Sequence, residues 1–328
     1  MTSFPLFHLP LVAMEHVLYM MNPLELFNIS LTSTKCKRSV KTLSRIKRKF
    51  LMSLGIAAEE QYVMLSRLQP AASWAFTWVS DESKTGYEED DRGGHDFYTV
   101  DKYSKNLVEE LMKCYEHIKE VFGCQIDDIH FELNSFPSQN EQIIDWILSH
   151  QETIARVTVK DTKEGFEDDL EYLLDNLTIT MTLDLSTKKY KRGFQLEIPR
   201  TPWHLIIKNS SFIDFDQLLT LENERISLSK SILTDQDINE FLKSWMACES
   251  HLYLETFEIN ISGPEAMEVI MDLPHNATAD PKVIRTFKKK FDGSQIQEGF
   301  DIENLDGEVA TVCYGLSSDG PRFFMFTR

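Results

Sequence analysis

The sequence predicts a mixed α/β protein with three short N-terminal helices, an irregular array of alternating strands and helices, and a C-terminal antiparallel hairpin. Three observations predict this order. Apolar residues recur at helical spacing in the first 50 residues, short strand patterns alternate with helical stripes from residue 126 to 262, and two strand-like segments near the C-terminus enclose a turn. The 328 residues suffice for one large domain or two ordinary ones.

Three helices are expected between residues 9 and 50. The first runs from Leu9 to Met21, the second starts at Pro23, and the third is basic and starts at a capping Thr34. Residues 30–33 are expected to form a polar turn between the second and third helices. The third helix is expected to turn three side chains inward, namely Val40, Leu43 and Ile46. Helices this short form a poor core alone, so their apolar surface is expected to need a partner.

The order of residues in this segment resembles the F-box. The matching residues are Phe7-His8-Leu9-Pro10, Val17-Leu18, Asn22-Pro23-Leu24-Glu25-Leu26, Leu31-Thr32-Ser33 and Lys37-Arg38. The resemblance covers residues 4–48 and departs from the family at Val40, where a Trp or Tyr is common. It implies binding to a Skp-family adaptor and, through that adaptor, to a cullin and a RING subunit.

The resemblance also implies which residues contact the adaptor. The matching positions are Pro5, Leu6, Leu9, Pro10, Val17, Leu18, Leu24 and Leu26. The alternative is that these residues form only the core of a helical N-terminal subdomain.

A repeated pattern, apolar-x-apolar-x-x-(Asn/Ser/Thr), marks six predicted strands. They start at Ile129, Val157, Met181, Leu205, Ile226 and Phe257. Helical stripes fill most of the gaps, including one that begins at a capping Thr234, so the strands are expected to be parallel. The pattern resembles a leucine-rich repeat with a degenerate polar position. A doubly wound sheet is the alternative, although no Gly-rich phosphate loop is present.

Residues 200–262 resemble the second type of F-box-associated domain. Phe241-Leu242-x-x-Trp245, followed by Leu254-Glu255-x-Phe257, is the most specific part of this resemblance. It implies a target-binding domain downstream of an F-box. The hairpin is expected from Glu308–Tyr314 and Arg322–Thr327. The predicted domains are an F-box at 4–50, a connecting helical and loop segment at 51–125, and a target-binding domain at 126–328.

Charge is divided unequally along the chain. Residues 1–58 carry eight basic and two acidic side chains, a net charge of +6, whereas the remainder carries 26 basic and 50 acidic ones, a net charge of −24. The acidic part argues against nucleic-acid binding, because it would repel phosphates. It favours a basic protein target, although acidic residues also serve solubility.

Membranes and secretion are not expected either. No apolar run reaches the roughly 18 residues of a membrane span. Five scattered cysteines without a secretory signal are expected to be reduced thiols of an intracellular protein, cytoplasmic, nuclear or both.

No catalytic, cofactor or metal motif is recognised in the sequence. Residues 80–96 are expected to form an acidic loop, and Asp81–Arg92 lacks the glutamate that closes a calcium loop. Cys114, His117, Cys124 and His130 do not match a zinc spacing. Together with this lack of catalytic motifs, the resemblance to the F-box and F-box-associated domains implies a non-catalytic substrate-recognition subunit of an SCF-type ubiquitin ligase. The alternatives are a repeat-like interaction scaffold without ligase association, and an enzyme with a site around His117 and His130.

Overall fold

The computed structural model describes residues 6–47, 50–161, 163, 165–278, 285–287, 289, 291 and 295–328. The chain divides into two compact units, Met1–Ile154 and Ala155–Arg328. The predicted domain boundaries at residues 50 and 125 both lie inside the first unit. Among the described residues, no helix combines the length and the apolar character needed to cross a bilayer.

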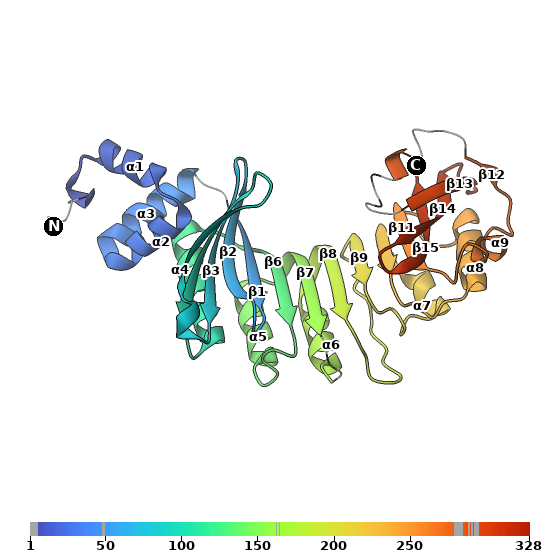
Figure 1. Cartoon of the computed structure of the whole chain (residues 1–328), viewed down its shortest axis with the longest axis horizontal. Helices are drawn as coiled ribbons and strands as arrows, with labels where there is room; N and C mark the ends of the chain where they lie inside the picture. Colours follow the sequence, from blue (N-terminus) through green and yellow to red (C-terminus); the bar gives the residue numbers. More distant parts are fainter. Residues whose placement is uncertain are drawn as a thin grey trace. The chain divides into compact units, whose positions relative to one another are not determined.

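The first unit begins with the three expected helices, drawn in blue in Figure 1. After a short 3₁₀ turn (η1, Leu6–His8) come α1 (Leu11–Met20), α2 (Pro23–Thr32) and α3 (Thr34–Lys47). Asn22 and Glu25 form a reciprocal capping box at the start of α2, where Pro23 occupies the first helical position.

Two details of this segment correct the sequence-based expectation. The helix α2 continues through Thr32, so residues 30–32 are helical rather than a turn. The side chain of Ser33 accepts a hydrogen bond from the backbone N–H of Cys36 at 3.2 Å, and the Lys37 N–H donates to the Ser33 carbonyl at 2.9 Å. Ser33, rather than Thr34, therefore caps α3.

Residues 51–103, expected to be connecting helix and loop, form five strands of a mixed sheet. They are β1 (Leu51–Ile56), β2 (Gln61–Leu68), β3 (Ala71–Val79), β4 (Gly86–Asp91) and β5 (Asp96–Tyr103). With β6 (Ile126–Glu132) their order is β6-β1-β2-β3-β5-β4. A short 3₁₀ turn, η2 (Glu82–Lys84), precedes β4.

The acidic segment at residues 80–96 is the clearest correction. Its residues Gly86–Asp91 are a strand that pairs antiparallel with β5, with Gly86 opposite Asp101 and Asp91 opposite Asp96. All six residues of β4 are exposed. A strand at a sheet edge with both faces in water can carry charges throughout, which hides the two-residue period on which strand prediction depends.

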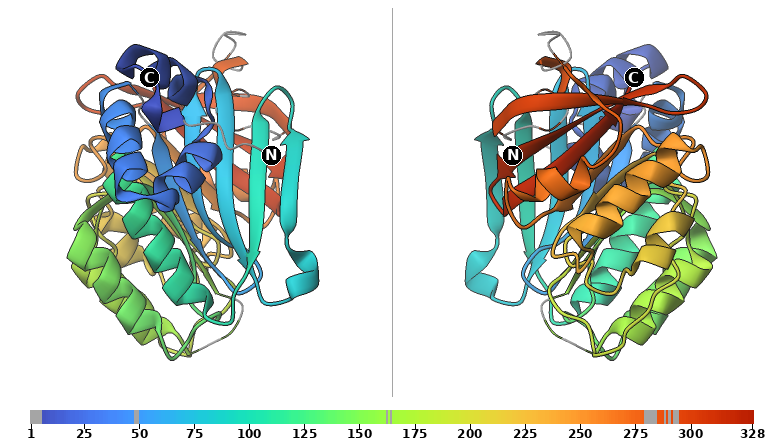
Figure 2. Two further views of the ribbon diagram at one scale, coloured as in Figure 1. Left: turned by 90° about the vertical axis from the view of Figure 1, so that its left-hand side faces the viewer. Right: turned by 90° about the vertical axis from the view of Figure 1, so that its right-hand side faces the viewer.

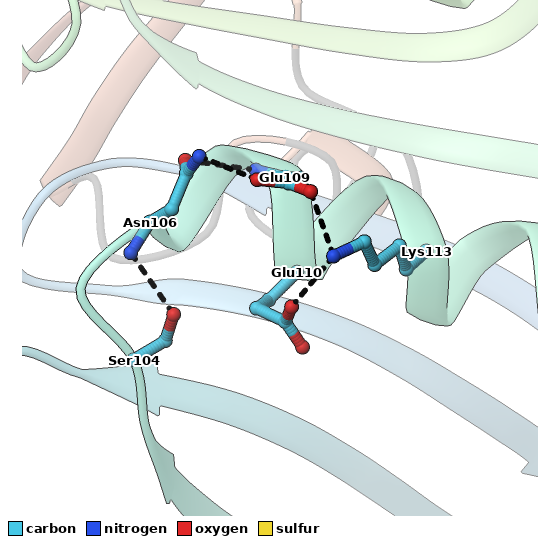
Figure 3. A network of polar contacts seen from close by, with 5 residues as sticks. All are labelled: Ser104, Asn106, Glu109, Glu110 and Lys113. Carbon is cyan, nitrogen blue, oxygen red and sulfur yellow. Dashed lines mark hydrogen bonds and ion pairs between the residues drawn. The ribbon is translucent and has the colours of Figure 1, made fainter.

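The helix α4 (Leu107–Phe122) packs on β2 and β3. Asn106 caps its first turn by accepting from the Glu109 N–H at 3.3 Å and donating to the Glu109 carboxylate at 2.7 Å (Figure 3). Lys113 pairs with Glu109 and Glu110 at 2.7 and 3.1 Å. The helix ends at Gly123, whose φ of +71° suits a residue without a Cβ. The helix α5 (Asn140–His150) completes this unit.

The second unit combines a parallel run of strands with an antiparallel end. The strands β8 (Thr178–Thr187), β9 (His204–Ile207), β10 (Arg225–Leu228) and β11 (Thr256–Asn260) pair in parallel, and β7 (Thr153–Asp161) lies next to β8. Beyond β11 follow β15 (Gly320–Thr327), β14 (Val309–Ser317), β13 (Gln295–Glu303) and β12 (Asn276–Ala277), all antiparallel to their neighbours.

Helices cover one face of this second sheet. They are α6 (Glu167–Asn176), α7 (Phe215–Thr220), α8 (Asp235–Met246) and α9 (Ala266–Ile270). Thr234 caps α8 as expected, in a capping box with Asp237. The helix α8, orange in the right view of Figure 2, sets the Phe241 ring 4.5 Å from that of Phe257 on β11.

Burial alternates along β9, β10 and β11, so this sheet has one apolar and one polar face. Leu205, Ile226 and Phe257 are buried on the helix-covered face. Their neighbours His204, Arg225 and Thr256 are only partly buried, on the opposite face. We call the latter the open face.

Candidate functional site

One side of the N-terminal helices packs into the first unit. The helices α2 and α3 contact α4, and α2 also contacts β3. Leu18, Leu24, Leu26 and Phe27 are almost fully buried. Burial of each such side chain contributes about 1.5–3 kcal/mol, so this inner side fixes the helices on the rest of the unit.

Phe27 is the centre of this contact. Its ring centroid lies 4.3 Å from that of Phe76 on β3 and 4.9 Å from that of His117 on α4. The ammonium of Lys102 lies 5.2 Å from the same ring. A further ion pair joins Lys37 of α3 to Glu120 of α4 at 2.6 Å.

His117 makes a polar contact within this mainly apolar region. Its Nε2 lies 2.6 Å from the Ser30 hydroxyl, which itself donates to the Phe27 carbonyl at 2.7 Å. Because a hydroxyl has one hydrogen, His117 must donate from Nε2 to Ser30. Burial lowers the pKa of His117, and Lys37 lowers it further, while Glu120 opposes the shift. The imidazole is therefore held as the neutral tautomer with its proton on Nε2.

The other side of α1 and α2 leaves large apolar side chains in solvent. Five of them are more than half exposed, among them Val12 at 66% and Met20 at 78%. We call this set the outer apolar surface; it consists of Leu11, Val12, Tyr19, Met20 and Leu31. Monomeric proteins rarely expose apolar side chains in such a group, and when they do it marks an interaction site.

The residues implied as adaptor contacts are divided between these two sides. Pro10 is exposed, three residues are partly buried, three are buried inside the first unit, and Pro5 lies outside the described residues. The partly buried residues are Leu6, Leu9 and Val17, and the buried ones are Leu18, Leu24 and Leu26. The buried three could touch a partner only by leaving their present surroundings, so their contact with an adaptor stays a prediction.

The outer apolar surface was not singled out from the sequence. Val12, Tyr19 and Met20 are seven and eight residues apart, which places them on one face of a helix. That spacing is the signal that could have found them. Whether this face of α1 or its neighbour lies in water depends on the contact of α1 with α3, which the local sequence does not reveal.

The cysteines and histidines weighed as a catalytic or metal site lie in separate environments. Burial raises the pKa of Cys114 to about 12 and that of Cys124 to about 11, so both remain protonated, poor nucleophiles at neutral pH. His117 contacts Ser30, whereas His130 lies 3.2 Å from the Asp128 carboxylate. Across the part of the chain that the structure describes, no three His, Cys, Asp or Glu residues are grouped to hold a metal ion.

Comparisons with known proteins bear on both units. A family model described as the F-box domain matches residues 6–48, and one described as F-box associated matches residues 194–259. The Skn-1 dependent zygotic transcript 15 protein of Caenorhabditis elegans is 24% identical over 349 residues, covering 98% of this chain and 96% of that protein. No solved structure matches the chain.

These matches confirm the two resemblances seen in the sequence. An F-box domain comprises α1–α3, and an F-box-associated domain of the second type includes β9, α7, β10, α8 and β11.

Proposed function

We propose that this chain is a substrate-recognition adaptor of an SCF-type cullin–RING ubiquitin ligase. Its F-box domain binds a Skp-family adaptor and, through it, a cullin, while its C-terminal domain binds a protein target. The chain itself performs no covalent chemistry. It raises the effective concentration of the target near the ubiquitin-charged enzyme, which is a large contribution to rate by itself.

The outer apolar surface of the F-box is the observation that carries this proposal. The helices α2 and α3 already pack on α4, α2 also packs on β3, and α1 packs on α3, so the domain is held in place without a partner. Leu11, Val12, Tyr19, Met20 and Leu31 nevertheless remain exposed. A partner that covers them gains the hydrophobic free energy that folding of this chain leaves unused.

The residues implied by the family resemblance extend this interface. Leu6, Leu9, Pro10 and Val17 are exposed or partly buried at or near α1, where an adaptor could reach them. Pro5 belongs to the same implied set. We infer that Leu18, Leu24 and Leu26 act mainly from inside, by holding α1 and α2 in the shape that the adaptor recognises.

We further infer that the strand–helix array of the second unit serves as a leucine-rich-repeat-like platform for the target. Polar side chains at or just after the ends of its strands bond to neighbouring segments: the Ser210 hydroxyl donates to the Ser229 carbonyl at 3.0 Å, and the Asn260 side chain accepts from the Ser231 N–H at 2.7 Å. The acidic excess of the chain favours a target with a basic surface overall. Work in such a ligase would place the protein in the cytoplasm, the nucleus or both.

Binding of the full chain to a purified Skp-family adaptor tests the proposal. The double variant Val12→Asp, Met20→Asp places two charges on the outer apolar surface and should weaken binding at least about a hundredfold, because desolvating a charge in an interface is costly. The matched control is Leu305→Asp, at a side chain 81% exposed in the second unit, and it should bind like the wild type. Circular dichroism checks that all variants are folded.

Failure of the wild-type chain to bind the adaptor would contradict the proposal and favour an interaction scaffold outside a ligase. If binding is seen, proteins captured in cells by the double variant should be compared with those captured by the wild type. Targets destined for degradation should accumulate on the variant that cannot reach the ligase. Leu24→Ala is unsuitable for this purpose, because Leu24 is buried and its loss would disturb the fold.

A further inference from the structure

The open face of the second sheet is hollowed by a concave pocket of about 790 Å³. Its lining comes from four neighbouring strands, β9, β10, β11 and β15, and from the turn between β14 and β15. Thr286, Lys289 and Phe291 also line it. The volume is in the range of ligand-binding sites, and the lining is rich in hydroxyl and cationic groups.

A buried arginine fixes the floor of this pocket. Arg322 is 3% exposed and donates from Nη1 to the Ser229 hydroxyl and from Nη2 to the Leu228 carbonyl, both at 2.9 Å. Its Nε lies 2.5 Å from the Glu258 carboxylate. These contacts orient Glu258 and Ser229 before any ligand arrives, so little conformational freedom is lost on binding.

A second arginine is also paired. Arg225 lies 2.6 Å from the Glu255 carboxylate, and its guanidinium is 4.7 Å from the Trp203 ring centroid. Burial lowers the pKa of His204, and the nearby Arg225 lowers it further, so this imidazole is neutral at physiological pH. Neither side chain is therefore a free cation.

Two lysines at the pocket have no counter-charge among the described residues. Within the described residues, neither Lys208 nor Lys289 forms an ion pair, and both are exposed to solvent. The charged lining therefore has an excess of positive charge in a chain whose net charge is −18. The lining cations are Lys208, Arg225, Lys289 and Arg322, and the lining acids are Glu258 and Asp319.

The extent of the pocket suits a short extended peptide. Four adjacent strands span three inter-strand spacings of about 4.8 Å, or roughly 14 Å, which is the length of about four residues of extended chain. Hydroxyl groups along this path can bond to peptide carbonyls or carboxylates. Those at the sheet and the turn are Ser227, Thr256, Ser317 and Ser318.

We propose that this pocket binds an extended acidic segment of the target, whose carboxylates are contacted by Lys208 and Lys289. This inference rests on the proposed function in one respect, namely that the ligand is taken to be part of the target protein. It separates two effects of charge: the acidic surface of the chain attracts basic proteins at long range, whereas the pocket recognises a local group of carboxylates.

Fluorescence anisotropy of the full chain with a labelled Ser-Glu-Glu-Glu-Glu-Ser peptide tests this proposal. The matched peptides replace the glutamates with glutamine or with phosphoserine. The glutamate peptide should bind, and the glutamine peptide should bind at least about tenfold more weakly. Lys208→Glu should weaken binding of the glutamate peptide about tenfold, and addition of Lys289→Glu should weaken it further. The control Lys243→Glu, at an exposed lysine of α8, should change it less than about twofold.

Three results would overturn the proposal: equal binding of the glutamate and glutamine peptides, equal losses with Lys208→Glu and Lys243→Glu, or binding of the phosphoserine peptide alone. The outcome is independent of the adaptor experiment. Peptide binding without adaptor binding would support the proposal for the pocket and contradict the ligase role. Adaptor binding without peptide binding would contradict only the proposal for the pocket.

Discussion

The F-box helices and the open face of the C-terminal sheet present different chemistry to solvent. The F-box exposes Leu11, Val12 and Met20, whereas the open face exposes ionic and hydroxyl groups such as Lys208, Arg225 and Ser227. An apolar surface binds any partner of fitting shape strongly, because the hydrophobic effect has no direction. A surface of paired and free charges binds fewer partners, since each charge must meet its complement. The difference fits a constant ligase partner at one surface and a selected target at the other.

The comparison requires that the inner side of the F-box packs on the rest of the first unit. The variant Phe27→Ala should weaken this packing. Phe27 is 4% exposed and contacts Phe76 and His117, so its loss should lower the free energy of unfolding of the first unit by about 3–5 kcal/mol. Val12→Ala, at a side chain 66% exposed on the outer apolar surface, should cost less than about 0.5 kcal/mol. Denaturant titration measures both. Similar losses for the two variants would contradict the division into inner and outer sides.

The open face is polar, whereas the helix-covered core excludes water. The titration of the buried His251 measures this exclusion. Its ring lies 4.8 Å from the Phe241 ring, and burial lowers its pKa to about 4. The pKa of His251 in the folded state lies below its unfolded value of 6.5, so above about pH 6.5 the imidazole is neutral in both states and the folded protein keeps its full stability. As pH falls from 6.5 towards 4, the unfolded state binds a proton that the folded state does not, and the free energy of unfolding decreases. The expected loss is on the order of 2–3 kcal/mol.

His251→Asn should remove this part of the acid sensitivity, while tolerating the φ of +55° at this position. Thermal unfolding of the wild type and the variant between pH 7 and 4 separates the contribution of His251 from that of the carboxylates, because both proteins contain the same carboxylates. An unchanged pH dependence in the variant would show that His251 is not buried as a neutral group.

The smallest expected effect concerns the polar contact within the F-box interface. His117→Phe removes the donor to Ser30 but keeps an aromatic ring beside Phe27, so the first unit should lose about 1 kcal/mol. In the wild type, ¹⁵N NMR of the imidazole should show the neutral form protonated on Nε2 at pH 7. A proton on Nδ1 would contradict the assigned hydrogen bond.

Much of the second unit could be predicted because its signals are local. The apolar pairs of five repeated segments lie on β7 to β11, and that of the first segment lies on β6 of the first unit. The cap at Thr234 and the stripe of α8 also lie where expected. Alternating burial on strands such as β9 and β10 leaves a two-residue period in the sequence. A helix with a capping box and an apolar stripe is equally visible.

The first unit could be predicted only in part because its sheet depends on tertiary contacts. The polar strand β4 exists through its pairing with β5, because the four acidic residues that follow Tyr87, Glu88-Glu89-Asp90-Asp91, disfavour a strand by themselves. The exposure of Val12 and Met20 is likewise set by a tertiary contact, that of α1 with α3. The pocket of the open face joins residues from position 204 to 324, which no local pattern connects.

Hydrogen–deuterium exchange of the full chain, with and without a Skp-family adaptor, tests the central claim most directly. The adaptor should slow exchange in α1 and α2, which carry the outer apolar surface, and leave β9, β10 and β11 unchanged. Unchanged exchange in α1 and α2 at saturating adaptor, or slowing confined to the second unit, would contradict the assignment of the F-box as the ligase-binding surface.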